Sequence, residues 1–320
     1  MDDKKPPLTN SEKKRVAVMD LGTNTFHLLI AEGTPLDYRE IVHEHVPVKL
    51  GEGGINKGII QPAAFERGMD TMRKFQQDIV KYEVKQVRAI ATSALRSASN
   101  GKQFIDDVKN QTGISIETIN GDQEADYIYK GVKLAGALSQ QTSLIMDIGG
   151  GSVEFILGNT DEILWKESFE IGAARLMDKF HQTDPIPNSS INDLNNYLDT
   201  CLTDMFAIAS KQPVDALIGS SGAFETFAEI IELEKGNPFE LKKIKNYAFQ
   251  TANLVEVTNK LIASSHQERK NTKGIISIRV DMIVVASLIT RFIMQKLNIN
   301  KVYMSTNSLK EGVLAEMLNT

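Results

Sequence analysis

Two segments of the chain share one alternation of apolar and polar positions. Residues 16–30 and 143–157 each read as an apolar strand, a tight turn containing glycine and a second apolar strand, and both contain Met-Asp-x-Gly. In each copy a third strand follows and ends at a glycine, Gly51 or Gly172. Short apolar segments bounded by turn residues are typical of hairpin strands. The repeat predicts that a whole α/β domain has been duplicated.

Helical spacing of apolar residues follows each hairpin. Pro62 opens a predicted helix, because proline suits the first helical position, and Phe65, Met69, Met72, Phe75 and Ile79 continue it as one apolar stripe. Strands are predicted at 87–91, 114–119, 214–218 and 301–305. Helices are predicted at 104–108, 122–138, 174–180, 190–211 and 309–318, and the segment from 219 to about 297 reads as mostly helix. This order predicts mixed sheets flanked by helices.

A length of 320 residues is about twice that of a typical domain. The chain has no linker rich in Pro, Gly or Ser, so two abutting domains around a cleft are expected. We place them at 1–138 and 139–306, with a terminal helix at 307–320 that packs back on the first domain.

Composition narrows the class of protein. The longest apolar stretch, 282–289, is far shorter than the roughly 20 residues of a membrane span, and the first residues lack the apolar core of a signal peptide. The single cysteine, Cys201, excludes an internal disulfide and fits a reducing compartment. A net charge of −5 argues against wholesale nucleic-acid binding. We therefore expect a cytoplasmic protein with no membrane or nucleic-acid partner.

Both turns of the repeat place a carboxylate and small residues at the end of an apolar strand. They contain Asp20, Gly22, Thr23, Asn24 and Thr25 in the first copy and Asp147, Gly149, Gly150, Gly151 and Ser152 in the second. Glycines allow close approach to a ligand, and free N–H groups bind anions. Two such loops across a cleft predict a phosphate cradle in which Asp20 and Asp147 hold a divalent cation. A third phosphate-binding loop is predicted before a helix, at Gly219, Ser220, Ser221 and Gly222.

Five segments carry a resemblance to a known family. They are residues 19–27, 91–100, 119–125, 146–154 and 219–222. In order and spacing the chain resembles the exopolyphosphatase/guanosine pentaphosphate phosphohydrolase (Ppx/GppA) family over nearly its whole length. The twin Asp-x-Gly hairpins also resemble the superfamily of actin, sugar kinases and heat-shock chaperone ATPases. The resemblance implies an α/β fold of duplicated actin-like, ribonuclease H-like domains around a central cleft.

The resemblance also implies phosphoanhydride hydrolysis with Mg²⁺, or in the alternative Mn²⁺. Glu124 matches the family's catalytic glutamate, the general base, and Arg96 matches an arginine that grips phosphate. Asp147 and Glu154 match carboxylates near the metal and the attacking water, and Asp20 is the repeat counterpart of Asp147. The chemistry requires an oriented water and neutralised charge on the phosphoryl oxygens. Taken alone, Glu124 also fits a carboxylate that only stabilises a helix N-terminus.

The chain departs from the family pattern at three positions. Gln123 stands where the family commonly has a first glutamate beside the catalytic one, and Lys49 and Lys310 stand in usual arginine slots. Lysine keeps the charge but loses the two-pronged geometry of a guanidinium group. Longer relatives carry an additional helical region after the point where this sequence stops. These departures affect the prediction of the substrate more than the prediction of hydrolytic activity.

Several other polar residues have competing interpretations. His43 and His45 could ligate a metal, but we favour exposed histidines on an edge strand. His27, in the repeat slot of Glu154, looks either into the cleft or into the core. The basic segment 242–245 is either a solvated surface or a guide for a polyanion.

Arg279 and Asp281 lie in a stretch that resembles an Arg-x-Asp segment of the family. We interpret them as a structural pair.

Three classes of function remain open. The leading one is an exopolyphosphatase that releases terminal phosphate from inorganic polyphosphate, and guanosine pentaphosphate is a second substrate for the same site. The alternatives are an ATP-dependent kinase and a non-catalytic sensor of polyphosphate or nucleotide. The family resemblance also suggests a homodimer.

Overall fold

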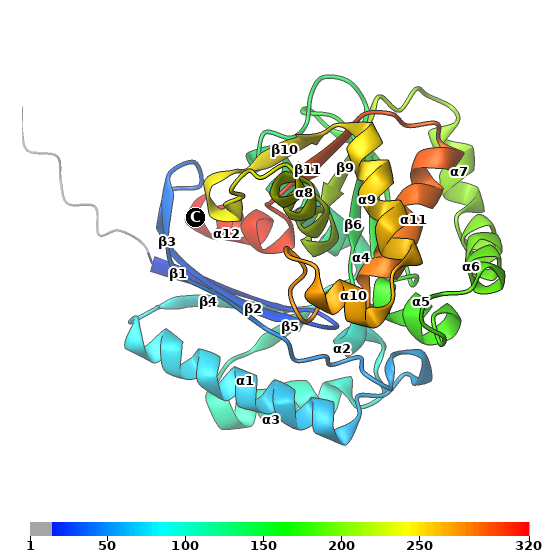
Figure 1. The fold of residues 1–320 in the computed structure, drawn as a ribbon. Helices are drawn as coiled ribbons and strands as arrows, with labels where there is room; N and C mark the ends of the chain where they lie inside the picture. The colour runs from blue at the N-terminus through cyan, green and yellow to red at the C-terminus, as the bar shows by residue number, and fades with distance from the viewer. Residues whose placement is uncertain (1–14, 320) are drawn as a thin grey trace, which may run out of the picture.

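The computed structural model of the chain describes residues 15–319 and contains two mixed sheets flanked by helices (Figure 1). The first sheet has the strand order β3-β2-β1-β4-β5. Its strands are β1 (Arg15–Leu21), β2 (Phe26–Gly33), β3 (Tyr38–Val46), β4 (Gln86–Ala91) and β5 (Ile116–Thr118). The helices of this half are η1 (Ile55–Lys57), α1 (Pro62–Lys81), α2 (Ser93–Ser97), α3 (Gly101–Thr112) and α4 (Gly121–Leu134).

The second sheet has the order β10-β11-β9-β6-β7-β8. Its strands are β6 (Ser143–Ile148), β7 (Val153–Gly158), β8 (Ile163–Phe169), β9 (Ala216–Ser220), β10 (Asn246–Phe249) and β11 (Val302–Ser305). The helices are α5 (Ala173–Phe180), α6 (Asn188–Cys201), α7 (Thr203–Ala209), α8 (Gly222–Glu234), η2 (Leu241–Lys243), α9 (Thr251–Ala263), α10 (His266–Asn271), α11 (Ile283–Lys296) and α12 (Leu309–Asn319). The predicted α/β class is confirmed. None of the helices between residues 15 and 319 has both the length and the apolarity that a membrane crossing requires.

The two hairpins have the same register, as the sequence repeat predicts. Asp20 on β1 lies opposite His27 on β2, and Asp147 on β6 lies opposite Glu154 on β7. In each sheet the first strand of the hairpin also pairs in parallel with a later strand, β4 or β9. Both hairpin turns therefore lie at the carboxyl ends of the central parallel strands, which is where ligands bind in open α/β sheets.

Helices α4 and α12 fill the space between the two sheets. One apolar cluster joins Val18 of β1 and Ile156 of β7 to Ile128 of α4 and Val313 of α12. On its other face the first sheet packs against α1 and α3 (Figure 1). The terminal helix α12 thus packs back on the first sheet.

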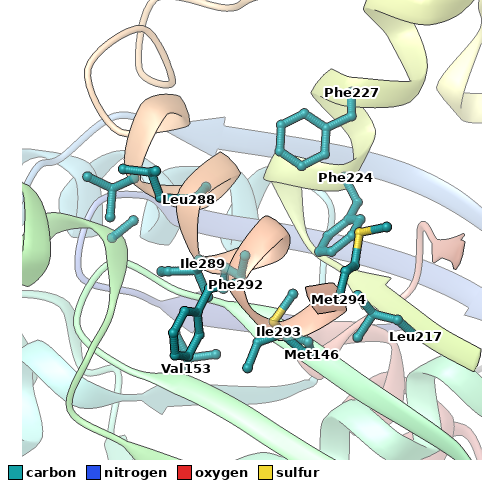
Figure 2. Packing of buried hydrophobic residues seen from close by; sticks show 14 of the residues in the cluster. Met146, Val153, Leu217, Phe224, Phe227, Leu288, Ile289, Phe292, Ile293 and Met294 are labelled. Carbon is teal, nitrogen blue, oxygen red and sulfur yellow. The ribbon is translucent and has the colours of Figure 1, made fainter. Parts of the chain in front are cut away.

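The second sheet has its own core. Ile289 and Ile293 of α11 pack with Phe224 of α8 over the buried strand residues Met146 and Val153 (Figure 2). All residues of β6 and β7 are buried, as is typical of strands covered on both faces. These strands form a rigid support for the second turn.

Two sequence-based predictions were wrong in detail. The helix predicted at 190–211 is two helices, α6 and α7, that meet at Leu202. Strand β9 runs to Ser220, so half of the third predicted loop belongs to a strand. The segment 219–297 is mostly helix, as predicted, although β10 and a non-helical stretch at 272–282 interrupt it.

Candidate functional site

A cavity of about 570 Å³ opens between the two sheets. Both hairpin turns, the start of α8 and the start of α12 line it. The predicted site residues in its lining are Asp20, Gly22, Thr23, Asn24, Thr25, Glu124, Asp147, Gly149, Gly150, Gly151, Ser152, Glu154, Ser221 and Gly222. Arg96, Gly219 and Ser220 are not among the lining residues. Most of the residues singled out from the sequence therefore meet in one cavity.

The two turns of the repeat touch each other across the cleft. A Cβ atom added at Gly150 would lie 2.1 Å from Asn24 Nδ2, and one added at Gly151 would lie 2.7 Å from Thr23 Oγ1. Real Cβ atoms do not show such distances, so a larger residue at either position would displace the side chains of the first turn. This close approach brings the anion-binding backbone of both copies to one point.

Asp147 is held by the third loop. Ser220 Oγ donates to Asp147 Oδ2 at 2.9 Å, and Ser221 Oγ donates to Asp147 Oδ1 at 2.7 Å. Ser221 has φ 70° and ψ 179°, a conformation that almost only glycine adopts readily. The third loop thus orients a carboxylate in addition to presenting backbone at the start of α8.

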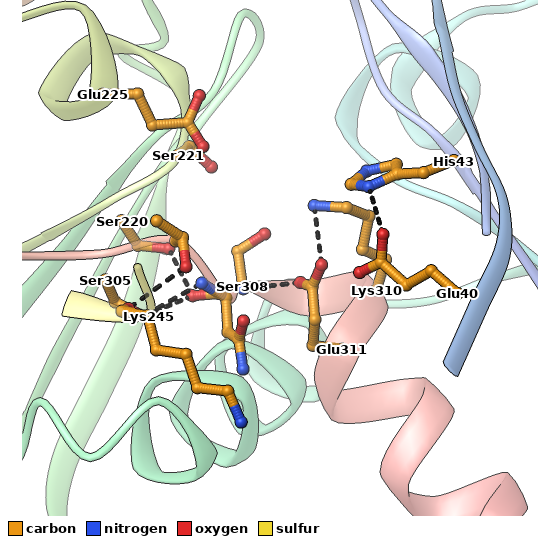
Figure 3. A network of polar contacts seen from close by, with 12 residues as sticks. Glu40, His43, Ser220, Ser221, Glu225, Lys245, Ser305, Ser308, Lys310 and Glu311 are labelled. Carbon is orange, nitrogen blue, oxygen red and sulfur yellow. Dashed lines mark hydrogen bonds and ion pairs between the residues drawn. The ribbon is translucent and has the colours of Figure 1, made fainter. Parts of the chain in front are cut away.

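Asp20 lies in an acidic environment. Burial is the main cause that raises the pKa of Asp20 to about 7; the charge of Lys310 opposes this rise, and the nearby carboxylates of Asp147 and Glu311 contribute to it. Burial likewise raises the pKa of Asp147. Lys310 itself is buried at the start of α12, where its ammonium group pairs with Glu311 at 3.0 Å (Figure 3).

Glu124 lies in the first turn of α4, whose start is fixed by a capping box. Asn120 Oδ1 accepts from the backbone N–H of Gln123 at 2.9 Å, and Gln123 Oε1 accepts from that of Asn120 at 3.0 Å. The amide of Gln123 thus fills the third helical position of the box, where glutamine and glutamate serve alike. Glu124 is 7% exposed, and its Oε2 accepts from Arg96 Nη1 at 2.9 Å.

The pKa of Glu124 is raised well above its ordinary value. Burial is the main cause, and the neighbouring charge of Glu154 adds to it while Arg96 opposes it. Glu154 accepts from Ser168 Oγ at 2.7 Å. Burial, with the charge of Asp147, raises the pKa of Glu154 to about 7. Two carboxylates with raised affinity for protons thus share one wall of the cavity.

Arg96 is engaged on three sides. Besides Glu124 it contacts the carbonyl oxygen of Ile119 at 3.0 Å and Glu170 Oε1 at 3.6 Å. Its side chain is 21% exposed. In this structure it is the partner of Glu124, and a direct contact with phosphate stays a prediction.

Histidines and lysines extend the cavity beyond the two turns. His27 lies in the lining, which confirms that it looks into the cleft. His43 and His45 are exposed on the edge strand β3, as favoured from the sequence, and also line the cavity. Lys242 and Lys245 line its outer part.

The predicted pairing of Arg279 with Asp281 is wrong. Arg279 pairs with Glu225 of α8 at 2.6 Å, whereas Asp281 contacts His266 at 3.2 Å and Lys49 at 3.9 Å. The guanidinium group of Arg279 instead lies against Gly222, where an added Cβ would be 2.4 Å from its Nη2. The two residues therefore belong to different contacts, although they are two positions apart.

The donor set fits a hard divalent cation held partly by the substrate. In the part of the chain that the structure describes, no three Asp, Glu, His or Cys side chains form a cluster that could hold a metal. Mg²⁺, however, usually binds through one or two carboxylates and completes its shell with water and phosphate oxygens. Asp20 and Asp147 supply such a pair. Desolvation is the main cause of their raised pKa values, so their ionised forms are costly unless an opposite charge, such as a cation, balances them.

Sequence reasoning missed two residues that organise this site. Ser168 holds Glu154 from the neighbouring strand β8. Arg175, three residues after Gly172, donates to the carbonyl oxygen of Gly151 at 2.8 Å and to that of Ile55 in the other half at 2.9 Å. The pairing of β7 with β8 places Ser168 opposite Glu154, and only this register could have identified Ser168 from the sequence. No local sequence pattern identifies Arg175.

Comparisons with known proteins agree on one family. A model of the Ppx/GppA phosphatase family matches residues 29–320. Among solved structures, the chain is similar to an exopolyphosphatase from Cytophaga hutchinsonii ATCC 33406, with 41% identity, a TM-score of 0.92, and coverage of 96% of this chain and 98% of that one.

Two curated proteins are also similar but longer. One is a bifunctional 3-dehydroquinate synthase/phosphatase of Fusobacterium nucleatum, 28% identical, with 94% of this chain and 46% of the relative covered. The other is a guanosine-5'-triphosphate,3'-diphosphate pyrophosphatase of Aeromonas salmonicida, 25% identical, with 94% of this chain and 59% of the relative covered. The chain spans about half the length of these two relatives.

Proposed function

The chain belongs to the Ppx/GppA phosphatase family, and from this premise we propose that its cleft hydrolyses the terminal phosphoanhydride bond of inorganic polyphosphate. One observation carries the proposal. The glycine turns of both copies, the half-buried carboxylate of Asp20 and the buried carboxylates of Glu124 and Asp147 line a single cavity. Backbone N–H groups suit phosphate, and the carboxylates suit a cation and a water.

Glu124 serves as the general base in this proposal. It is buried beside Glu154, and both conditions raise its pKa toward the range in which a carboxylate accepts a proton efficiently near neutral pH. Arg96 holds one of its oxygens and leaves the other for water. The water attacks the terminal phosphorus in line with the leaving phosphate, and Glu124 takes its proton.

A divalent cation, Mg²⁺ or Mn²⁺, is the expected cofactor. Asp20 and Asp147 would hold it, with Glu154 beside the attacking water. When bound, it neutralises negative charge on the phosphoryl oxygens. Ser220 and Ser221 keep Asp147 oriented for this role by donating to both of its oxygens.

Guanosine pentaphosphate is the second candidate substrate. The lining of the cavity also includes apolar side chains, among them Ile276 and Met282, and the exposed lysines Lys242 and Lys245. An apolar wall with nearby cations has room for a nucleoside as well as for further phosphates. The same triphosphate end would enter the cleft in either case.

The deciding experiment is a side-by-side assay of free phosphate from polyphosphate, guanosine pentaphosphate and ATP. We expect release from polyphosphate, with or without release from guanosine pentaphosphate, and none that depends on a phosphoryl acceptor. Transfer from ATP to an acceptor would favour the kinase. Binding of polyphosphate without any release would favour the sensor.

Two properties of the whole protein belong to the same proposal. The single cysteine supports residence in the reducing cytoplasm, and the family resemblance supports a homodimer. Light scattering coupled to gel filtration measures the second: a mass near 71 kDa, twice the 35.5 kDa of the chain, is expected for the dimer.

A further inference from the structure

Helix α5 is attached directly to the second phosphate turn. The backbone N–H groups of Ala173 and Ala174 donate to the carbonyl oxygens of Gly149 and Gly150, each at 2.9 Å. A Cβ atom added at Gly172 would lie 2.4 Å from the backbone of Gly150. The start of α5 therefore cannot move without moving the turn.

The side chain of Arg175 extends from this helix into the other half of the molecule. Its Nε donates to the carbonyl oxygen of Gly151 at 2.8 Å. Its Nη1 donates to the carbonyl oxygen of Ile55 at 2.9 Å, and its Nη2 to Ser97 Oγ at 3.3 Å. One guanidinium group, 14% exposed, thus joins the second phosphate turn to η1 and to α2 of the first half.

Arg175 also reaches the candidate base through one further carboxylate. Its Nη2 pairs with Glu170 Oε2, which also accepts from Ser93 Oγ at 3.2 Å. The other oxygen of Glu170 lies 3.6 Å from Arg96 Nη2, and Arg96 holds Glu124 at 2.9 Å. The contacts form an unbroken series from Arg175 through Glu170 and Arg96 to Glu124.

We propose that Arg175 is a positioning residue that couples closure of the cleft to the placement of Glu124. This inference rests on the proposed function, because it assigns Arg175 an effect on the step that Glu124 performs. When the two halves are closed, Arg175 reaches Ile55 and Ser97 and at the same time holds Glu170 against Arg96. In an open cleft it would lose the first two contacts, and Glu170 would lose its fixed place.

The geometry distinguishes this role from simple support. Asn56 also bridges the seam between η1 of the first half and α5 of the second half. Its Nδ2 donates to the carbonyl oxygen of Arg175 at 3.1 Å and to Asp178 Oδ2 at 2.8 Å. Neither of these hydrogen bonds involves Glu170. Removal of the Asn56 side chain weakens the seam alone, whereas removal of the Arg175 guanidinium group weakens the seam and frees Glu170.

The experiment compares Arg175→Met, Arg175→Lys, Glu170→Gln and Asn56→Ala, with Arg73→Met as a control that changes an exposed arginine paired with Asp70. Phosphate release is measured over a range of substrate concentrations.

We expect Arg175→Met to lower kcat ten- to a hundredfold with KM within about threefold, and Glu170→Gln to lower kcat several-fold. Arg175→Lys and added guanidinium chloride should each restore part of the kcat lost in Arg175→Met. Asn56→Ala and Arg73→Met should stay within twofold of the unaltered protein.

Two results would overturn the inference. One is an Arg175→Met kcat within twofold of the unaltered protein, and the other is an equal loss in Asn56→Ala, which would assign the effect to the seam alone. If Arg175→Met does not fold, Glu170→Gln decides, because it keeps the contacts of Arg175 with Ile55 and Ser97; an unchanged kcat there contradicts the series.

Failure of the proposed function would look different. In that case the unaltered protein itself would release no phosphate. Small-angle X-ray scattering then tests closure without turnover: Arg175→Met should have a larger radius of gyration than Glu170→Gln, and equal radii contradict the inference.

Discussion

Four carboxylates line the cleft, of which those of Glu124, Asp147 and Glu154 are buried and that of Asp20 is half-buried. Desolvation raises the pKa of each. Their negative charge is opposed by Lys310 on one side and by Arg96 on the other. Both cations are already paired, with Glu311 and Glu124 respectively. Protons or a divalent cation must therefore balance the remaining charge, because isolated buried carboxylates are costly.

The first prediction concerns the base. Glu124→Gln keeps the size of the side chain but cannot accept the proton of water, so phosphate release should fall by about 10²–10⁴. Folding, followed by the thermal midpoint, and substrate binding should stay near those of the unaltered protein. Glu117→Gln, which changes an exposed carboxylate also paired with an arginine, is the matched control. A Glu124→Gln variant that hydrolyses within threefold of the unaltered protein contradicts the assignment.

The second prediction concerns stability and pH. Asp20 has an ordinary pKa of 3.8 and a folded-state pKa of about 7, so between these values the folded state binds a proton that the unfolded state has released. The free energy of unfolding should therefore fall as pH rises from about 4 to 7. Mg²⁺ should raise the thermal midpoint at pH 8 more than at pH 5, because it binds the ionised form. Asp20→Asn should flatten both dependences, and an equal effect of Mg²⁺ at the two pH values would contradict the prediction.

The third prediction concerns the cofactor directly. Protein treated with EDTA should lose phosphate release and regain it when Mg²⁺ or Mn²⁺ is added in excess, since hard oxygen ligands suit these ions. Addition of K⁺ at equal ionic strength is the control. Full activity in excess EDTA would rule out the cation.

At the scale of elements, local patterns predicted the hairpins, α1 and the succession of three strands in each repeat, because these depend on periodicity and turn residues. They did not predict which side chains pair between distant segments. The partner of Arg279 is Glu225, 54 positions away, and Arg175 bonds Ile55, 120 positions away. No periodicity encodes such pairs. The break at Leu202 was missed for a related reason, since an apolar residue continues the helical pattern that the fold interrupts.

The fourth prediction concerns the junction of α5 with the second turn. Gly172→Ala would place a Cβ atom 2.4 Å from the backbone of Gly150, so backbone must shift. We expect a loss of about 1–3 kcal/mol in the free energy of unfolding and a clear loss of phosphate release. Gly113→Ala is the control, because an added Cβ there meets nothing within 4 Å and only the left-handed backbone is strained. This substitution should lower the free energy of unfolding by about 1–2 kcal/mol and leave phosphate release unchanged. Wild-type activity in folded Gly172→Ala would contradict the coupling.

At the scale of the whole molecule, the cleft is a short site with few unpaired cations. Arg279 and Lys310 line it but are paired with Glu225 and Glu311. Lys242 and Lys245 remain at its outer part, beside Glu40. Among the residues that the structure describes, 15–319, a long polyanion would therefore find few cations in the cleft beyond those near its terminal phosphates.

The fifth prediction follows from this charge distribution. With two or three phosphate contacts, the log–log slope of affinity against salt should be about −2, at roughly −0.7 to −0.9 per contact. We expect comparable kcat/KM on short and long polyphosphate between about 50 and 300 mM KCl, a range over which condensed counterions compete strongly, and intermediates visible on gels. A steep slope on long chains, with polymer vanishing without intermediates, would indicate an extended basic track.

The position of α12 between the two sheets also bears on how the protein is made. Val16 and Val18 of β1 belong to one apolar cluster with Ile128 of α4 and with Val313 and Leu314 of α12, which follow β1 by almost 300 residues. On the ribosome, the inner face of the first sheet therefore lacks the cover of α12 until that helix has emerged. During that interval an apolar surface is open to chaperones or to neighbouring nascent chains. Synthesis of the N-terminal half alone is thus not sufficient to complete the core between the two sheets. Strand β1 is made at the start of translation, but this core closes only near its end.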